Sequence, residues 1–288
     1  MDAGDAALLP DPHNQDRVAR DGRRVARQPF GFRPLEQRWC RELYAGHGKL
    51  SAALERRGFS IATPIEAIKD GRFRQAHNLE SRSVHLKLLR DIKNQIYAYV
   101  HFGIVCTSWG PASRMSGGSR RPHCLYGNPP TERERRGNVQ AMHMCSLLNA
   151  LIDSGGFFTV ENPAGSYLWD TKWVQRICKK TETYFVTFDQ CQFGLRPPAA
   201  RRHEYTRKRT TIWTNMKSFQ DLAILCCGCS FSHVHVHAWG VRSVSGKCVR
   251  LACAAGSYPT ALCEAIADKL SEHLSHGVAA AVAAPPPF

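Results

Sequence analysis

Apolar positions along the chain gather in short runs of β-branched and aromatic residues, which alternate with segments in which apolar residues recur at helical spacing. A short apolar run that stops at a small or turn-forming residue is typical of a buried strand in a parallel sheet. Alternation of such strands with helices predicts an α/β fold with a doubly wound, mostly parallel sheet of the Rossmann-like type. The expected strands lie within RELYA (41–45), FSIATPIEA (59–67), IYAYVHFGIVCTSWG (96–110), FFTVENP (157–163), TYFVTFDQCQFG (183–194) and RTTIWTN (209–215). The expected helices include KLSAALERRG (49–58) and VQAMHMCSLLNALIDSG (139–155).

Both ends of the chain lack this periodicity. Residues 1–36 mix Arg, Asp, Pro and Gly and cannot bury enough apolar surface to offset chain entropy, so we expect a disordered arm. Residues 277–288 contain a proline run that stops a helix, and we expect a disordered tail. The expected domains between them are a core at 37–215, a small Cys/His-rich insert at 216–255 and a closing helix of the core at 256–276.

The charge of the chain favours a polyanionic partner. It has 39 Lys and Arg against 24 Asp and Glu, a formal net charge of +15, which makes nucleic acid a reasonable partner. No run approaches the roughly 18 apolar residues of a membrane span, and the acidic start MDAGDAALLPDP lacks the order of a signal peptide. We therefore expect an intracellular protein without membrane contact, whose 12 cysteines are reduced and available for catalysis or metal binding.

Two of the apolar runs carry a polar group near the end of the expected strand, where a folded core rarely places one. These groups are Cys106 in IVCTSWG and Glu161 in FFTVENP. Ligands of open α/β sheets bind outside the carboxyl ends of the strands, so both residues are candidates for one shared site. Cysteine is also among the most often buried residue types, and a structural cysteine is the alternative interpretation of Cys106 alone.

A glycine turn joins the first expected strand to the first expected helix. Gly46 and Gly48 permit a tight turn and let a ligand approach the backbone where helix amides point outward. Glu66 ends the next apolar segment, about where nucleoside-binding folds place a carboxylate for ribose hydroxyls. A simple strand-to-helix turn with an exposed glutamate remains the alternative.

Five regions resemble, in chain order, motifs of the DNA (cytosine-5) methyltransferases. The order runs from about residue 39 to residue 270, and a short Cys/His-rich insert stands where that family has a large target-recognition domain. The chain thus looks like a divergent, compact member, with Val105, Gly110, Pro163 and Tyr205 departing from the family pattern. The matching segments are ELYAGHGKLSAAL (42–54), VCTSWG (105–110), VENP (160–163), FDQCQFG with RKRTTIWTN (188–194 and 207–215) and AAGSYPTALCEAIADKL (254–270).

The resemblance implies methyl transfer from S-adenosylmethionine to carbon 5 of cytosine in DNA. Cys106 would add as a thiolate to carbon 6, with its pKa lowered by a nearby Arg or by backbone amides. Glu161 would hold the ring-nitrogen edge of the base and favour its protonated state. Arg207 and Arg209 would orient base or phosphate, whereas we interpret Lys208 as part of a solvated basic face. The residues assigned to the methyl donor are Tyr44, Gly46, Gly48, Glu66, Asp91 and Tyr258.

Such chemistry needs a cytosine extruded from the duplex or a single strand. The Arg-rich segments 114–127 and 196–209 are typical of loops that contact phosphates around an extruded base, although charged loops can also be merely soluble. We expect a monomer that binds nucleic acid, with DNA as the expected partner, in a nucleus or nucleoid. Two alternatives stay open: a nucleic-acid-binding relative that has lost catalysis, and a methyltransferase for RNA or another base.

The insert carries a separate candidate site. Cys226, Cys229, His233 and His235 offer thiolate and imidazole ligands at short range for a structural zinc, and the HVHVH alternation places its histidines on one face of a strand. The spacing between the two ligand pairs is shorter than zinc sites usually have. A half-buried strand with ordinary cysteines is therefore the alternative interpretation.

Overall fold

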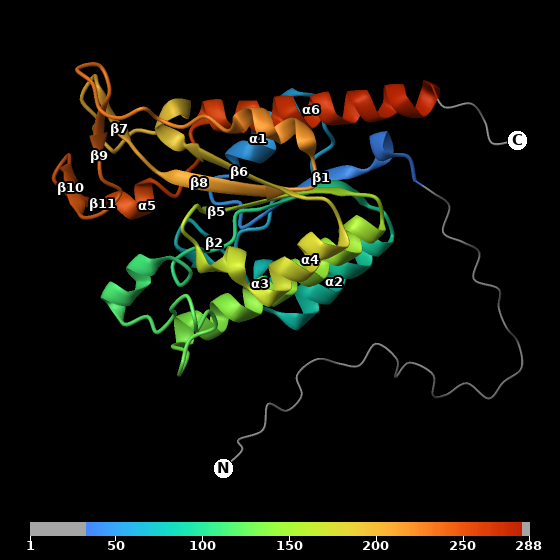
Figure 1. Ribbon diagram of the computed structural model, residues 1–288, viewed down its shortest axis with the longest axis horizontal. Coiled ribbons are helices and arrows are strands. Elements are labelled where there is room, and N and C mark those ends of the chain that lie inside the picture. The colour runs from blue at the N-terminus through green and yellow to red at the C-terminus, as the bar shows by residue number, and fades with distance from the viewer. Residues whose placement is uncertain (1–32, 284–288) are drawn as a thin grey trace, which may run out of the picture. The chain divides into compact units, whose positions relative to one another are not determined.

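The structure, a computed structural model, describes residues 33–283 (Figure 1). Residues 1–32 of the predicted arm and 284–288 of the predicted tail lie outside the described residues. At the first end, Leu35–Gln37 form a short 3-10 helix that precedes the core. At the other end, helix α6 (Thr260–Ala283) continues past residue 276, where the sequence prediction ended it.

A five-stranded sheet forms the centre of the protein, in the order β1 (Trp39–Leu43), β4 (Tyr97–Phe102), β5 (Phe157–Pro163), β8 (Arg209–Thr214) and β6 (Tyr184–Asp189). The first three are parallel, and β8 runs antiparallel to both of its neighbours. Four of the five strands therefore point the same way, which confirms the mostly parallel sheet.

The segment 59–67 is not a full strand. It contacts β1 only through isolated bridges from Ile61 to Cys40 and from Ile65 to Leu43. Pro64 lies between these bridges and has no amide hydrogen for a continuous ladder. The segment still follows the edge of the sheet, so Glu66 emerges beside the end of β1.

Helices cover both faces of the sheet, as a doubly wound fold requires (Figure 1). Helix α1 (Lys49–Arg56) packs with α6 on one face. Helices α2 (Arg82–Lys93), α3 (Glu132–Asp153) and α4 (Lys172–Lys180) cover the other face. Strand β4 is buried along its whole length. Its Tyr99 packs into the hydrophobic core on the face covered by α1 and α6, while Val100 and Phe102 pack into the core on the face covered by α2, α3 and α4.

Shorter elements surround this core. The 3-10 helices are Gln75–His77 (η2), Pro111–Ser116 (η3), Tyr167–Asp170 (η4), Gln190–Phe193 (η5) and Lys217–Leu222 (η6). Small strand pairs are β2 (Ile68–Lys69) with β3 (Arg72–Phe73), β7 (Glu204–Thr206) with β9 (Val234–Val236), and β10 (Val241–Val244) with β11 (Lys247–Arg250). The insert also contains α5 (Leu251–Ala254), and its strand β9 pairs in parallel with β7 of the core. Within residues 33–283, no helix is both long enough and apolar enough to cross a membrane.

Candidate active site

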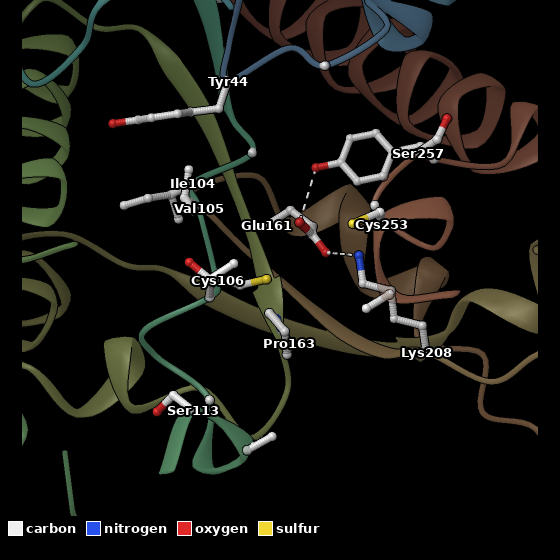
Figure 2. Close-up of a pocket in the computed structure, with 18 of the residues that line it drawn as sticks. Tyr44, Ile104, Val105, Cys106, Ser113, Glu161, Pro163, Lys208, Cys253 and Ser257 are labelled. Atoms are coloured by element: carbon white, nitrogen blue, oxygen red, sulfur yellow. Dashed lines mark hydrogen bonds and ion pairs between the residues drawn. The ribbon is translucent and has the colours of Figure 1, made fainter. Parts of the chain in front are cut away.

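A cavity of about 870 Å³ opens beyond the carboxyl ends of β1, β4 and β5. Its walls come from the loop after β1, the loop after β4, strand β5, the residue before β8, and the segment around α5 that leads into α6. Cys106 and Glu161 both line it, as the sequence predicted for a shared site. Figure 2 shows the sulfur of Cys106 pointing to the side of the cavity where Glu161 and Lys208 lie.

The two side chains reach the cavity differently from the prediction. Strand β4 ends at Phe102, so Cys106 lies in the following loop and not at a strand end. Glu161 lies inside β5, not at its end. The adjacent Asn162 is buried and donates from Nδ2 to the carbonyl of Ile104 at 2.9 Å, which ties the Cys106 loop to the neighbouring strand.

A stacked pair of side chains holds the rest of the Cys106 loop. Trp109 is fully buried. Its backbone N–H donates to the carbonyl of Cys106 at 3.0 Å, and its backbone carbonyl accepts from the backbone N–H of Tyr167 at 2.9 Å. The guanidinium of Arg120 lies 3.6 Å from the Trp109 ring and donates to Ser108 and to helix α3. Because Arg120 is fully buried, it cannot contact a phosphate as we expected for the segment 114–127.

Glu161 is held from two sides. Its Oε1 lies 3.3 Å from Nζ of Lys208, and its Oε2 accepts a hydrogen bond from the hydroxyl of Tyr258 at 3.2 Å (Figure 2). Both partners line the cavity, and Lys208 is mostly buried, with 16% of its side chain exposed. The carboxylate therefore lies in a partly desolvated setting with one cationic and one neutral partner.

A chain of hydrogen bonds continues from Tyr258 into the sheet. His101 Nε2 lies 3.1 Å from the Tyr258 hydroxyl, and His101 Nδ1 lies 2.8 Å from Oγ1 of Thr159, which also bonds the hydroxyl of Tyr99. Burial lowers the pKa of His101 to about 3, so the ring is neutral at neutral pH. Since the single proton of Tyr258 is donated to Glu161, His101 must carry its own proton on Nε2 and accept on Nδ1.

The electrostatics at Cys106 differ from the expectation. Burial raises the pKa of the Cys106 thiol, the charge of Glu161 raises that pKa further, and Lys208 and a backbone hydrogen bond at Cys106 oppose them. The expected backbone contribution is therefore present, but Lys208 takes the place of the expected Arg, and because the pKa is raised overall the thiol is protonated at neutral pH. Lys208 is the cation whose approach favours the thiolate.

The segment 207–209 shows why Lys208 matters and was missed. Arg207 and Arg209 do not line the cavity, because both guanidinium groups bond to the buried carboxylate of Asp189. Side chains alternate along an extended chain, so the residue between two arginines on one side faces the other side. That alternation predicts that Lys208 faces away from the two arginines, and the contact across the sheet places it with Glu161.

The expected donor residues divide between two adjoining hollows. Tyr44, Gly46 and Tyr258 line the Cys106 cavity. Gly46, Gly48 and Glu66 line a neighbouring hollow of about 490 Å³, and residues 45–47 border both. Sequence reasoning missed other residues of the larger cavity, notably the buried Glu42, and Gly103, where an added Cβ would lie 3.0 Å from the carbonyl oxygen of Tyr44.

Glu66 holds the glycine turn. One carboxylate oxygen accepts from the N–H of Gly46 at 2.9 Å, and the other accepts from the N–H of Ile68 at 3.2 Å. Gly46 and Gly48 have φ of +52° and +68°, a backbone region that side chains disfavour, and Gly48 directly precedes α1. The turn is therefore fixed by its backbone conformation and by the carboxylate together.

Asp91 is the one expected donor residue that the structure places elsewhere. It lies near the end of α2, pairs with Lys87 and accepts from the hydroxyl of Tyr97, the first residue of β4. The cavity lies beyond the opposite end of that strand. Asp91 is thus excluded from the donor site, because its helix packs on the face of the sheet and ends at the wrong edge.

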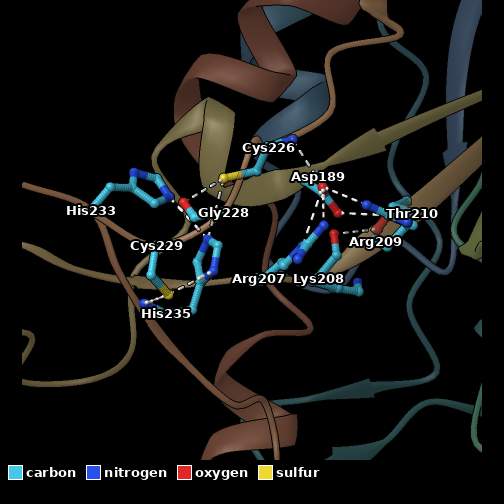
Figure 3. A network of polar contacts seen from close by, with 10 residues as sticks. All are labelled: Asp189, Arg207, Lys208, Arg209, Thr210, Cys226, Gly228, Cys229, His233 and His235. Atoms are coloured by element: carbon cyan, nitrogen blue, oxygen red, sulfur yellow. Dashed lines mark hydrogen bonds and ion pairs between the residues drawn. The ribbon is translucent and has the colours of Figure 1, made fainter.

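Cys and His residues of the insert lie close together, but the group they form differs from the predicted one by one residue. Cys226, His233 and His235 group with Cys191 of η5, and the four ligand atoms lie within 4.8 Å of one another. The fourth predicted ligand, Cys229, contacts the far nitrogen of His235, Nδ1, at 3.4 Å (Figure 3). Cys229 thus lies outside this group of four, because its sulfur lies on the other side of the imidazole ring.

Comparisons with known proteins assign no family to this chain. No protein-family model and no curated protein matches the chain. Among solved structures, it is similar to the crystal structure of S. pombe Dnmt2 methyltransferase at 11% sequence identity and a TM-score of 0.36, over 61% of this chain and 48% of that chain. The likeness thus spans about half the length of that structure.

Proposed function

We propose that this protein transfers a methyl group from S-adenosylmethionine to carbon 5 of cytosine in DNA, with Cys106 as nucleophile. The observation that carries the proposal is the shared cavity of Cys106 and Glu161, which lie on adjoining segments of neighbouring parallel strands. A thiol and a carboxyl group facing one space can address two edges of a planar base. Lys208 and Tyr258 fix the carboxyl group in that orientation.

The glycine turn fits the methyl donor. An added Cβ at Gly46 would meet no atom within 4 Å, so the bare backbone leaves open space there for a ligand. Each oxygen of Glu66 accepts one backbone hydrogen bond and keeps a lone pair for a ribose hydroxyl. Gly46, Gly48 and Glu66 would hold the nucleoside part, and Tyr44 borders the path towards Cys106. When bound, the donor supplies a methyl group without its bonding electron pair.

The protein's own residues make carbon 5 reactive. The Glu161 carboxylate takes the proton of the Cys106 thiol as the sulfur bonds to carbon 6, the electron pair of the 5,6 double bond becomes available at carbon 5, and Glu161 passes that proton to the ring nitrogen. Carbon 5 then takes the methyl group. Loss of the proton from carbon 5 to water leaves an electron pair that re-forms the 5,6 double bond while the sulfur–carbon bond breaks, and the ring-nitrogen proton returns through Glu161 to the sulfur, which frees Cys106.

Charge around the cavity favours a nucleic-acid substrate. Its lining includes the cationic residues Lys49, Arg133, Lys208 and Arg250. These agree with the net charge of +15 over the whole chain. A polyanion that approaches this edge would find phosphate partners at the rim, and an extruded or unpaired base would reach the interior.

The test is covalent trapping on DNA that carries 5-fluorocytosine, in the presence of the donor. Fluorine at carbon 5 prevents the proton loss that frees the enzyme, so the wild-type protein should form an adduct that survives denaturation. Cys106→Ser should form none. Cys253→Ser is the matched control, because Cys253 lines the same cavity and should be dispensable.

Glu161→Gln separates the base-directed role from donor binding. We expect trapping to slow by about 100-fold or more, the usual range for loss of general acid catalysis, while S-adenosylhomocysteine binds unchanged. Mass spectrometry of nucleosides from DNA and RNA incubated with labelled donor identifies the modified base. Methylated RNA with unmodified DNA would contradict the DNA assignment.

A second function is favoured by one observation, the raised pKa of the Cys106 thiol. A protonated thiol suits a relative that binds nucleic acid without chemistry. A wild-type protein that binds both donor and DNA but never forms the adduct would support this alternative.

A further inference from the structure

Four metal-ligating side chains meet where the insert touches the end of β6. Cys191 comes from η5, directly after that strand, and Cys226, His233 and His235 come from the insert. Their ligand atoms all lie within 4.8 Å of one another. Both cysteines are buried and both histidines are half-buried, so the group is closed on the protein side.

We propose that Cys191, Cys226, His233 and His235 bind a structural zinc ion. In a tetrahedral site with Zn–S of about 2.3 Å and Zn–N of about 2.0 Å, neighbouring ligand atoms lie roughly 3.3 to 3.8 Å apart. Cys226 Sγ lies 3.4 Å from His235 Nε2, and the two Nε2 atoms of His233 and His235 lie 3.1 Å apart. These two pairs are thus already close to tetrahedral spacing, and every other pair of ligand atoms lies within 4.8 Å.

Cys229 orients a ligand and does not provide one. Its sulfur lies 3.4 Å from Nδ1 of His235, and it also accepts from the backbone N–H of His235 at 3.4 Å. A ligating histidine almost always donates its other ring N–H to an acceptor, which fixes the tautomer. With the proton on Nδ1 facing Cys229, the lone pair of His235 Nε2 points into the group of four.

His233 is also held in place before any ion binds. Its ring stacks on Tyr205 at 4.2 Å with an interplanar angle of 7°. The guanidinium of Arg196 lies 4.6 Å from the same tyrosine ring and donates to its hydroxyl at 3.0 Å. The parallel pairing of β7 with β9 aligns Tyr205 with His235. Both histidines therefore have fixed positions relative to the core.

The middle of the insert, residues 223–250, needs such a link because it has almost no core of its own. Among residues 223–250, Cys226 is the only apolar residue that is buried. Large apolar side chains such as Phe231, Trp239 and Val241 are exposed. Small units that cannot build a hydrophobic core are usually held by disulfides or metal ions, and a metal here would fasten the insert to the sheet.

The metal site would also be connected to the Cys106 cavity through hydrogen bonds and ion pairs. The N–H of Cys226 donates to Asp189 at 3.0 Å, and Asp189 holds Arg207 and Arg209 on either side of Lys208 (Figure 3). An ion at Cys226 would thereby fix the extended segment that presents Lys208 to Glu161.

The test is metal analysis of the full chain purified without added zinc, with cobalt(II) as a spectroscopic substitute. We expect about one equivalent of zinc, and a cobalt spectrum with tetrahedral d–d bands and the charge-transfer intensity of two thiolates. Cys191→Ser and Cys226→Ser should each lose the metal. Cys229→Ser should keep one equivalent and both thiolate contributions, with affinity about 10-fold or more weaker. Cys227→Ser, an exposed neighbour, is the control with no expected change.

Cys229→Ser decides the ligand set even if Cys191→Ser does not fold, because Cys229 is exposed. A cobalt spectrum reduced to one thiolate in that variant would overturn the assignment in favour of Cys226 with Cys229. Wild-type protein without bound metal, and without cobalt uptake, would overturn the site itself.

Discussion

Replacement of Glu134 by Gln should destabilise the loop that leads away from Cys106. Glu134 is the third residue of α3 and is fully buried. Its Oε1 accepts from the N–H groups of Ser119 and Arg120 at 2.7 and 3.0 Å, and its Oε2 accepts from Ser119 Oγ and from the N–H of Thr131, both at 2.8 Å. A glutamine amide would turn an N–H group towards these donors, so part of the arrangement must break.

The pKa of Glu134 sets the size of the effect. Burial would raise this pKa, but the hydrogen bonds from Thr131, Ser119 and Arg120 outweigh it and lower the pKa from 4.5 to about 2. A shift of that size corresponds to roughly 3 kcal/mol of stability if water does not screen the group. Because a glutamine keeps one acceptor oxygen and only part of the arrangement breaks, we expect a loss of about 1 to 2 kcal/mol at pH 7.

Urea unfolding at a series of pH values checks both size and sign. A carboxyl group whose pKa is lowered by folding stabilises fully above its unfolded pKa, and that stabilisation disappears as pH falls towards the folded pKa. The difference between wild type and Glu134→Gln should therefore be full at pH 7 and shrink below about pH 4.5, towards pH 2. Glu132→Gln is the matched control, since Glu132 is exposed in the same turn and pairs with Arg135. Equal losses in the two variants, or a Glu134 difference that persists undiminished at pH 3, would refute the reasoning.

Two further predictions concern the cavity. The alkylation rate of Cys106, measured by mass spectrometry of its peptide, should rise with pH, and the midpoint of this pH dependence should lie above 9. Lys208→Met should move that midpoint higher, because it removes the cation that lowers the pKa. Lys49→Met, which removes another cation from the same cavity, should leave the midpoint unchanged. A wild-type midpoint below about 8.5, the pKa of a free thiol, would contradict the prediction. Glu66→Ala should weaken S-adenosylhomocysteine binding by about 1 to 3 kcal/mol in calorimetry, because a carboxylate acceptor is lost. Asp70→Ala in the same hollow should have no effect, and equal affinities of wild type and Glu66→Ala would remove this donor pocket from the proposal.

The fold could be predicted because its strands are nearly continuous apolar runs. Strand β4 is buried on both faces, and such a run is readable from the sequence without tertiary information. The meeting of Cys106 and Glu161 followed from the rule that parallel strands end at one edge. The sequence predicts too long a strand within 59–67, because the apolar pattern continues through Pro64 while the hydrogen-bond ladder does not.

The residues that sequence reasoning missed depend on contacts across the sheet. Arg207 and Arg209 were assigned to the substrate because nothing local reveals that Asp189 lies between them and takes up both charges. The membership of Cys191 in the Cys/His group is hidden for a similar reason, since it lies far from Cys226 in the chain and meets it only when the insert folds back on η5. Local spacing favours Cys229, which is nearer in sequence but lies on the wrong side of an imidazole ring.

One wall of the cavity depends on Tyr258, which lies late in the sequence. Glu161 belongs to the middle of the sequence, but the hydroxyl that orients it comes from the residue just before the proline that leads into α6. Helix α6 also packs against α1, which follows the glycine turn near the other end of the core. A chain that ends before Tyr258 would hold β1, β4 and β5 and still lack one wall of the cavity. Cys106 and the carboxyl group of Glu161 are therefore not enclosed together until synthesis has passed Tyr258.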